Sequence, residues 1–338
     1  MRGFGACAVI LAHAFASNLA SAQTPESFYR DHPIDLVIGG GAGGSFDLYG
    51  RLFQRHLGAH LPGHPQIVAR VMPGASGFAA VQWLATLAPH DGTAIAILPP
   101  QLALQQAMAL NSLRYDARAF NWIGRAAPAV EATYTWHLSP TKTIEDAKRR
   151  ETVMGSPTGG SSGATYLKLL NTIVGTKFHV VTGYNGTTEA NLAMERGEIE
   201  GTSKPWNGLK VDNADWVRDR KIQILVQYGL ERSPELPDVP TLTELGPTEL
   251  DRSAFRFLAA GPEMGRPFAA PPGLPQDRIA ALRQAFMDTF ADPEFQADAK
   301  QMNIDLGAAP GDYLQKLVGD TLGFQAEAMA RAKHAIED

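Results

Sequence analysis

IDLVIGGGAGGSFD, residues 34–47, is the stretch that decides the fold. Its apolar first part predicts a buried strand, five glycines follow within six residues, and a helix is expected from about Asp47. A glycine turn between a strand and a helix N-terminus gathers several backbone N–H groups around one point. Because those donors and the helix dipole favour negative charge, the stretch predicts an anion site.

Two further strands extend this unit along the chain. Residues 66–72 and 93–98 are expected as strands, and a second helix is expected over 78–87. The resulting βαβαβ order predicts an α/β fold with a parallel sheet. Ligands bind beyond the carboxyl ends of such strands. The turns at that edge are 39–44, 73–77 and 99–101.

A second unit repeats the opening design. Residues 153–163, VMGSPTGGSSG, again join a strand end, a Gly/Ser turn and a helix, which is expected over 164–174. Two α/β units therefore each carry N–H-rich turns at strand ends. The other expected elements are strands at 178–182, 199–203 and 221–227, proline-rich loops at 233–247 and 267–275, and helices at 276–290, 293–302 and 312–336.

Composition limits the classes of function. The chain has 338 residues, of which 44% are hydrophobic and 19% charged, so about two globular domains are expected. The formal net charge of -5 argues against nucleic acid as a partner. A small anionic ligand is compatible with it, because local N–H dipoles decide that case.

The first 22 residues predict a secretory signal peptide. Arg2 gives a positive start, an apolar segment too short to span a bilayer follows, and Ala20-Ser21-Ala22 matches a cleavage pattern. Cleavage after Ala22 would remove Cys7, the only cysteine, so no disulfide or thiol chemistry is expected. The mature protein is expected in the periplasm.

A dinucleotide site is one alternative for the opening stretch. Residues 39–44 match G-x-G-x-x-G between a strand and a helix. The second strand ends with Arg70 where an acidic residue should meet the ribose, although arginine would suit a 2′-phosphate. Nicotinamide cofactors are scarce outside the cytoplasm, so no cofactor is predicted.

An exported serine hydrolase is a second alternative. Residues 159–163 match G-x-S-x-G with Ser161 as the nucleophile. The histidines that follow are His179, in the middle of a predicted strand, and His334, in the last predicted helix. Neither placement suits a triad, so the protein is predicted not to be an enzyme.

A metal site is a third alternative. His56, His60 and His64 recur at a spacing of four, so the first two could share a helix face. Pro62 breaks the helix before the third, and no carboxylate completes the pattern. No metal site is predicted.

Polar and aromatic side chains at the turns complete the candidate site. Tyr184 and Trp206 follow strands and could line a pocket. Lys204 could pair with a carboxylate, although an exposed lysine is the commoner outcome. Asp47 could cap its own helix or accept a hydrogen bond from a ligand ammonium, and capping is favoured.

Several motifs, taken in order, resemble one family. They are AGGSFD at 42–47, PGASG at 73–77, APHDGT at 88–93, GSPTGGS at 155–161, GYNG at 183–186 and RSPELPDVPT at 232–241. Together they resemble the extracytoplasmic solute-binding receptors of tripartite tricarboxylate transporters, also called Bug proteins. The resemblance covers nearly the whole mature chain.

The resemblance implies a two-lobed type II periplasmic binding protein fold with a hinge and a central ligand cleft. It implies a first lobe at 23–124 plus 229–338 and a second lobe at 125–228. The implied role is to capture a small organic anion, a carboxylate, and deliver it to the membrane subunits of a tripartite tricarboxylate-type transporter. The receptor is expected to be a monomer without catalysis, and a ligand-sensing module without transport is the alternative.

The predicted ligand contacts come from both units. They are Ala42, Gly43, Gly44, Ser45, Asp47, Gly77, Ser156, Gly160, Ser161, Tyr184, Gly186, Thr187, Lys204 and Trp206. The chain departs from the family pattern at Gly39 and Gly40, where a proline and an aromatic residue are usual, and at Asn185, where lysine is usual. Val71-Met72 also replace the common asparagine-arginine pair.

Overall fold

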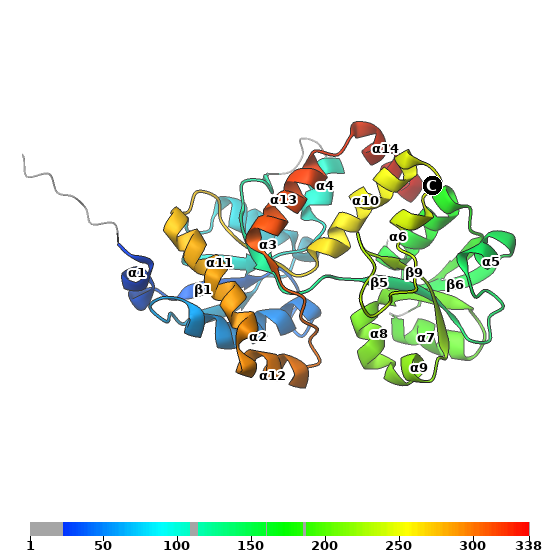
Figure 1. Ribbon diagram of the computed structural model, residues 1–338, viewed down its shortest axis with the longest axis horizontal. Helices are drawn as coiled ribbons and strands as arrows, with labels where there is room; N and C mark the ends of the chain where they lie inside the picture. The colour runs from blue at the N-terminus through cyan, green and yellow to red at the C-terminus, as the bar shows by residue number, and fades with distance from the viewer. Residues whose placement is uncertain (1–22, 109–113, 160, 185–186, 338) are drawn as a thin grey trace, which may run out of the picture.

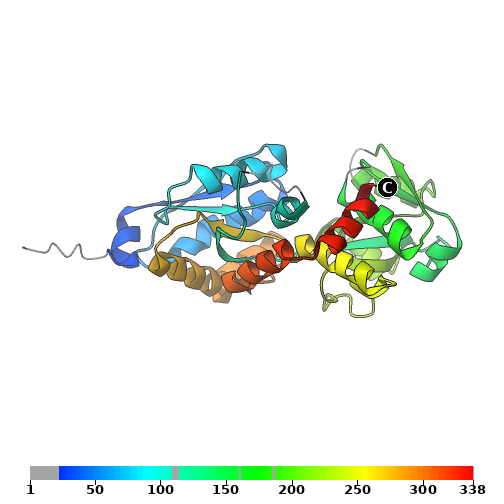
Figure 2. The same cartoon turned by 90° about the horizontal axis from the view of Figure 1, so that it is seen from above.

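The computed structural model describes residues 23–108, 114–159, 161–184 and 187–337. The predicted signal peptide lies outside these residues. The described chain forms two α/β lobes, joined in the middle (Figure 1). Seen from above, helices α10 and α13 lie along one side of the junction (Figure 2).

The first lobe is built on a sheet to which the described residues contribute six strands, in the order β11-β4-β10-β3-β1-β2. Strands β1, β2 and β3 pair in parallel, as the βαβαβ pattern predicts. The strands are β1 (Ile34–Ile38), β2 (Ile67–Val71), β3 (Ala94–Ile97), β4 (Asn121–Arg125), β10 (Pro267–Ala270) and β11 (Ala309–Pro310).

Strand β10 corrects a prediction. The sequence predicts a loop over 267–275 from its prolines, but residues 267–270 are a buried strand that pairs antiparallel with β3 and β4. Pro267 is the first residue of the strand, where the missing N–H costs least, and its carbonyl accepts from the Leu98 N–H at 3.0 Å. Proline therefore marks where this strand begins.

Helices cover both faces of the first sheet. Under one face, the Phe53 ring stacks on Phe286 with centroids 4.9 Å apart and meets Phe268 at 4.6 Å, so helices α2 and α11 are joined to β10 through one aromatic core. The helical segments are α1 (Pro25–Asp31), α2 (Ser45–His60), η1 (Ala75–Gly77), α3 (Phe78–Thr86), α4 (Leu102–Met108), α11 (Gln276–Ala291), α12 (Pro293–Gln301) and α13 (Gly311–Leu322).

The second lobe is built on a sheet of five described strands in the order β7-β6-β8-β5-β9. Strands β6, β7 and β8 are parallel, so their carboxyl ends share one edge. The elements are β5 (Glu131–Trp136), α5 (Ile144–Arg149), β6 (Thr152–Ser156), α6 (Ser162–Leu169), η2 (Leu170–Val174), β7 (Phe178–Thr182), α7 (Thr187–Glu195), β8 (Gly201–Pro205), α8 (Trp206–Asp212), α9 (Ala214–Arg218) and β9 (Ile222–Tyr228).

Two helices near the junction differ from expectation. The sequence predicts a loop over 233–247 and no helix from 248 to 266. Helix η3 (Thr243–Leu245) lies in the first of these segments, and the 16-residue α10 (Glu249–Met264) lies in the second. Pro262 lies in the last turn of α10, and a proline normally argues against a helix, so the hydrophobic spacing of this segment does not predict one. The single helix predicted over 312–336 is two, because the chain breaks after α13 and resumes as α14 (Ala326–Glu337).

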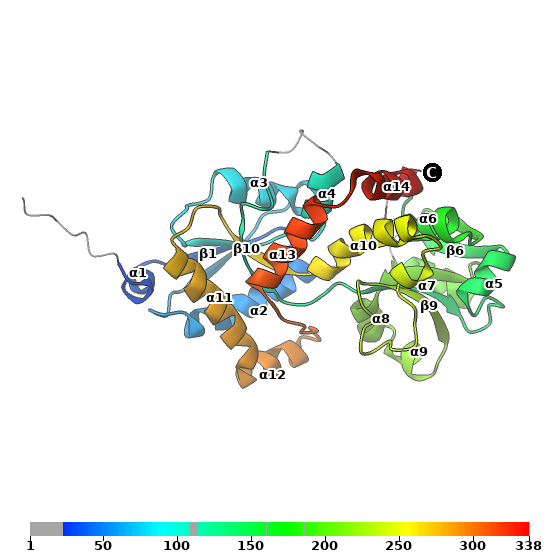
Figure 3. The same cartoon turned by 45° about the horizontal axis from the view of Figure 1, so that its top comes forward.

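The chain passes between the lobes more than once. Residues 126–130 join β4 of the first sheet to β5 of the second, and α10 leads back to β10. Helix α14 packs on α10 and α6, as the tilted view shows (Figure 3). The lobe limits, 124/125 and 228/229, stay a prediction. Strand β4 of the first sheet runs to Arg125, one residue beyond the first of these limits.

Candidate functional site

The glycine turn after β1 leads directly into the N-terminus of α2. Residues 41–45 are exposed, and the N-cap residue Gly44 has no side chain to cap the helix. The Gly43 N–H donates to Asp47 Oδ2 at 2.8 Å, and Arg51 donates to Asp47 Oδ1 at 3.1 Å. Asp47 therefore stabilises the glycine turn before its own helix, and this structural role is the one that the sequence favours. The first N–H groups of α2 have no side-chain cap and belong to an exposed segment.

Arg266 lies beside this helix end. It lies two residues after the end of α10, and its backbone hydrogen-bonds Ala126 and Ala127 in the connection between the lobes. Its Nε donates to Ser45 Oγ at 3.0 Å, and the guanidinium lies 4.9 Å from the centre of the Phe46 ring. Burial lowers the pKa of Arg266 below its ordinary value, but a guanidinium keeps its charge.

The charge of Arg266 has no salt-bridge partner among the described residues. The other hinge arginine, Arg125 on β4, is paired with Glu263 and also donates to the Gly307 carbonyl. A half-buried cation without a carboxylate partner is costly unless an anion meets it. Arg266 and the N-terminus of α2, which touch through Ser45, together make this corner of the first lobe positively polarised.

Glu131 faces this region from the second lobe. It is the first residue of β5, and the Ser162 side chain at the start of α6 is close enough to act on the pKa of its carboxyl. Its Oε2 atom is buried and has no hydrogen-bond partner in the described chain. Burial raises the Glu131 pKa to about 7, although Ser162 and Arg266 act to lower it.

A cavity of about 280 Å³ lies next to Glu131. Helix α4 of the first lobe and α6 of the second form its sides, and α10 and α14 also contribute. The lining is completed by residues 100–101 before α4 and by Ala129 and Glu131. The lining is mainly apolar, with a few polar groups beside Glu131, which is typical of small-molecule sites. Its residues are Pro100, Gln101, Leu104, Gln105, Met108, Ala129, Glu131, Ser162, Thr165, Tyr166, Leu169, Leu258, Gly261, Pro262 and Ile336.

Gly77, another predicted contact, has a structural role in the fold. Its N–H donates to the Gly74 carbonyl at 2.9 Å, and its φ is +91°. A Cβ here would lie 2.3 Å from the Gly39 carbonyl oxygen. The departure from the family pattern at Gly39 therefore coincides with a close approach of two backbones at this edge.

Ser156 and Ser161 are brought together at the end of β6. Their hydroxyl oxygens are 2.6 Å apart, Ser161 Oγ donates to the Thr158 carbonyl at 2.9 Å, and it accepts from the Ala164 N–H. Ser161 is thus the N-cap of α6. These contacts are those of a helix cap and not of a nucleophile activated by a base.

The other predicted side chains have partners in the second lobe. Lys204 is buried and bonds Asp212 at 2.6 Å, so its charge is already compensated. The Trp206 indole donates to Glu235, and Trp206 lines a second hollow at the hinge. Tyr184 is half-buried against Gly155 at the end of β6, which keeps it at the predicted edge.

Some predicted contacts cannot be placed. Gly160 and Gly186 lie outside the described residues, and Thr187 is described only as the first residue of α7. The ligand role of the whole predicted set stays a prediction.

The weaker alternatives find ordinary partners. Arg70 forms an ion pair with Asp35 at 2.8 Å, so its charge is already compensated without a 2′-phosphate. His56 bonds Asp298 and His60 bonds Asp292, each at the surface between α2 and the α12 segment. Within the described residues, no cluster of three metal-ligating side chains occurs.

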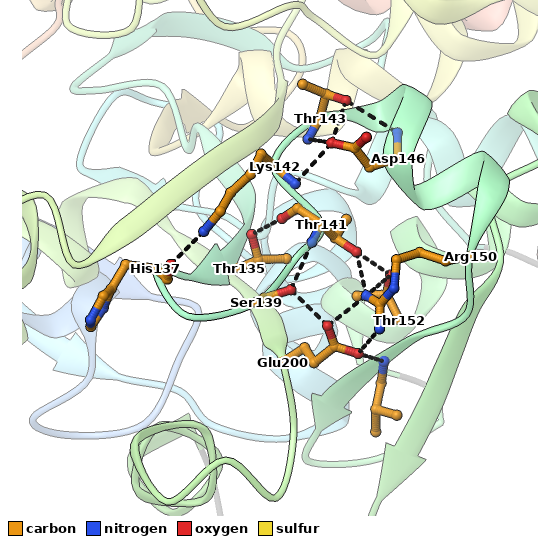
Figure 4. Close-up of polar contacts among 11 residues, drawn as sticks. Thr135, His137, Ser139, Thr141, Lys142, Thr143, Asp146, Arg150, Thr152 and Glu200 are labelled. Carbon is orange, nitrogen blue, oxygen red and sulfur yellow. Dashed lines mark hydrogen bonds and ion pairs between the residues drawn. The ribbon is translucent and has the colours of Figure 1, made fainter.

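A polar network at the far end of the second lobe is also structural. Glu200 receives two hydrogen bonds from Arg150, at 2.6 and 3.1 Å, and one from Ser139 (Figure 4). Thr141 and Thr152 bond each other at 2.7 Å beside it. Every charge in this network has its opposite, in contrast to Arg266.

Comparison with known proteins places the chain in a family. The model of the tripartite tricarboxylate transporter family receptor matches residues 51–333. The chain belongs to this receptor family. A UPF0065 protein in the gbd 5′ region of Cupriavidus necator is 28% identical over 328 residues, covering 90% of this chain and 89% of its own.

Solved structures of receptors share the fold. A TctC solute-binding protein from Polaromonas, without ligand, has a TM-score of 0.69 at 21% identity and covers 90% of this chain and 99% of its own. The R. palustris protein Rpa4515 with adipate has a TM-score of 0.60 at 19% identity, with coverages of 90% and 98%. The two-lobed periplasmic binding protein fold that the resemblance implies is confirmed.

Within this receptor fold, sequence reasoning missed Arg266 and Glu131. Arg266 comes just before the proline-rich stretch 267–275 that predicts a loop, and Glu131 begins a strand whose other residues are buried. In both cases the sequence feature that could have pointed to the residue is a single charge at the edge of an apolar run. Among the residues that the structure describes, no helix is both long and apolar enough to cross a bilayer.

Proposed function

We propose that this receptor binds a small organic anion through a carboxylate and delivers it to the membrane subunits of a tripartite tricarboxylate-type transporter. The observation that carries the proposal is Arg266, a half-buried cation without a salt-bridge partner in the described chain, beside the uncapped N-terminus of α2. Both groups favour a carboxylate. The adipate in the related R. palustris structure supports the same class of ligand.

The lobes would close on the ligand. Arg266 and α2 belong to the first sheet's side of the hinge, whereas Glu131 and Ser162 belong to the second lobe. A ligand that touches both sides binds the closed arrangement better and shifts the population toward it. We place this receptor in the periplasm, as a non-catalytic monomer released from a signal peptide.

Calorimetry on the mature chain tests the proposal. A panel of mono- and dicarboxylates and amino acids is titrated into the wild type, Arg266→Gln and Arg55→Gln. Arg55 is a matched control, because it is an exposed arginine of α2 paired with Asp298. Loss of one charge-assisted contact predicts about ten- to hundredfold weaker binding for Arg266→Gln alone. Undiminished binding by Arg266→Gln, or no binding of any acid by the wild type, would refute the proposal.

A further inference from the structure

The cavity beside Glu131 indicates what kind of acid the receptor takes. At about 280 Å³ it lies near the lower end of small-molecule sites, which span about 300–1,000 Å³. Leu104, Leu169 and Leu258 supply apolar walls from three different helices. A compact ligand made only of polar groups would leave these walls without a partner, so the cavity favours an apolar side chain.

Glu131 lines the cavity beside these apolar walls. Ser162 lines the cavity with it, and the buried Oε2 atom of Glu131 has no hydrogen-bond partner in the described chain. Such an acceptor favours a ligand with a donor, and a cationic donor most of all. A second ligand carboxylate at this position would instead meet like charge in a desolvated place.

Arg266 supplies the opposite charge nearby. Its positive charge acts to lower the pKa of the Glu131 carboxyl, against the effect of burial. The two groups nevertheless form no salt bridge with each other in the described chain. The site therefore offers one cation, one anion and an apolar cavity, each without a complete partner.

We propose that the ligand is a zwitterionic amino acid with an apolar side chain. Its carboxylate meets Arg266 and the N-terminus of α2, its ammonium meets Glu131, and its side chain enters the cavity between α4 and α6. This inference rests on the function proposed above and narrows it from carboxylates in general to one chemical class. It also explains why the carboxylate of Glu131 lies in a site that binds an anion.

The test compares ligands that differ only in the ammonium group. L-leucine and 4-methylpentanoate, and L-phenylalanine and 3-phenylpropanoate, are titrated into the mature protein at pH 8. Leucine is expected to bind about ten- to hundredfold more tightly than 4-methylpentanoate, because it alone can make the charge-assisted contact to Glu131. In Glu131→Gln the two affinities should become similar.

A second variant tests the cavity. Ala129 lines it, whereas the neighbouring Val130 lines the other hollow at the hinge. Ala129→Leu should weaken phenylalanine binding at least tenfold, and Val130→Ile should not. Thermal unfolding of both variants shows that they fold.

Each outcome decides between the claims. Binding of 4-methylpentanoate or adipate as tight as that of leucine overturns the amino-acid inference and leaves the carboxylate function standing. An affinity ratio unchanged in Glu131→Gln, or full phenylalanine affinity in Ala129→Leu, overturns the assigned contacts. If no acid of any kind binds, the proposed function itself fails.

Discussion

Glu131 should make the empty receptor less stable as pH rises. Its carboxyl pKa is raised from the ordinary 4.5 to about 7, chiefly by burial. Below pH 4.5 the folded and unfolded chains both hold the proton. Between pH 4.5 and 7 the unfolded chain releases a proton that the folded chain keeps, so the free energy of unfolding falls with pH. Above pH 7 the loss is complete.

The size of the effect follows from the shift. About 2.5 pH units at 1.36 kcal/mol each correspond to about 3 kcal/mol, which is an order-of-magnitude value. The other titratable groups that act on this carboxyl are Arg266, Tyr166 and Tyr228. Burial raises the pKa of both tyrosines, so both stay neutral over this range, and Arg266 keeps its charge.

The assay is urea unfolding of the mature chain at intervals from pH 5 to pH 8.5, without ligand. Glu131→Gln removes the titrating group and keeps the shape of the side chain. The variant should gain stability relative to the wild type as pH rises, by up to about 3 kcal/mol. A difference that stays flat between pH 5 and pH 8 would refute the reasoning.

Glu200→Gln is the matched control, because the sign of its effect is opposite. Burial raises the pKa of Glu200, but hydrogen bonds from Arg150 and Ser139 outweigh burial and lower the pKa overall. Glu200 therefore stabilises the fold above its ordinary pKa, and this contribution is lost as pH falls through its lowered pKa. The variant should be less stable than the wild type at pH 7, and the difference should shrink in acid.

Three further predictions concern the framework. Gly77→Ala should lower the free energy of unfolding by more than about 2 kcal/mol in urea, because its Cβ would meet the Gly39 carbonyl at a positive φ; near-neutral stability would contradict this. Ser161→Ala should cost about 1 kcal/mol through loss of the α6 cap, and hydrolysis of generic esters should be absent before and after the change. Lys210→Met breaks an ion pair with Asp305 that joins α8 to the first lobe. The substitution should change the free energy of unfolding by less than about 1 kcal/mol. It should nevertheless increase the radius of gyration of the ligand-free protein in small-angle scattering, and an unchanged radius would argue against a bridging role.

The parts of the fold predicted from sequence are those with a local cause. Strand β1, the glycine turn and α2 follow one another within 27 residues, and hydrophobic spacing identifies each. Strand β10 and helix α10 were not predicted, because proline dominates the local sequence signal of each. Pro267 begins a strand, and Pro262 falls in a helix's last turn. In both places burial against distant parts of the chain overrides the local preference.

The candidate site likewise has parts with a local cause in the sequence and parts without one. The turns at the strand ends were predicted, but several of their N–H groups already serve the fold: Gly43 bonds Asp47, and Gly77 bonds Gly74. These donors hold the turns in shape and so hold the N-terminus of α2 in place. The charges that would distinguish one ligand from another come instead from Arg266 and Glu131, at two separate passages of the chain through the hinge.

That arrangement has a consequence for specificity. A type II binding fold can keep its N–H-rich turns, and with them a general preference for anions, while charges at the hinge change from one receptor to another. Because Ala126 and Ala127 hydrogen-bond the backbone of Arg266, the two passages of the chain lie side by side at the hinge, and one substitution at Glu131 or Arg266 changes the charge there. Exchanging Glu131 for a neutral residue should therefore change which acid is preferred before it changes whether acids bind.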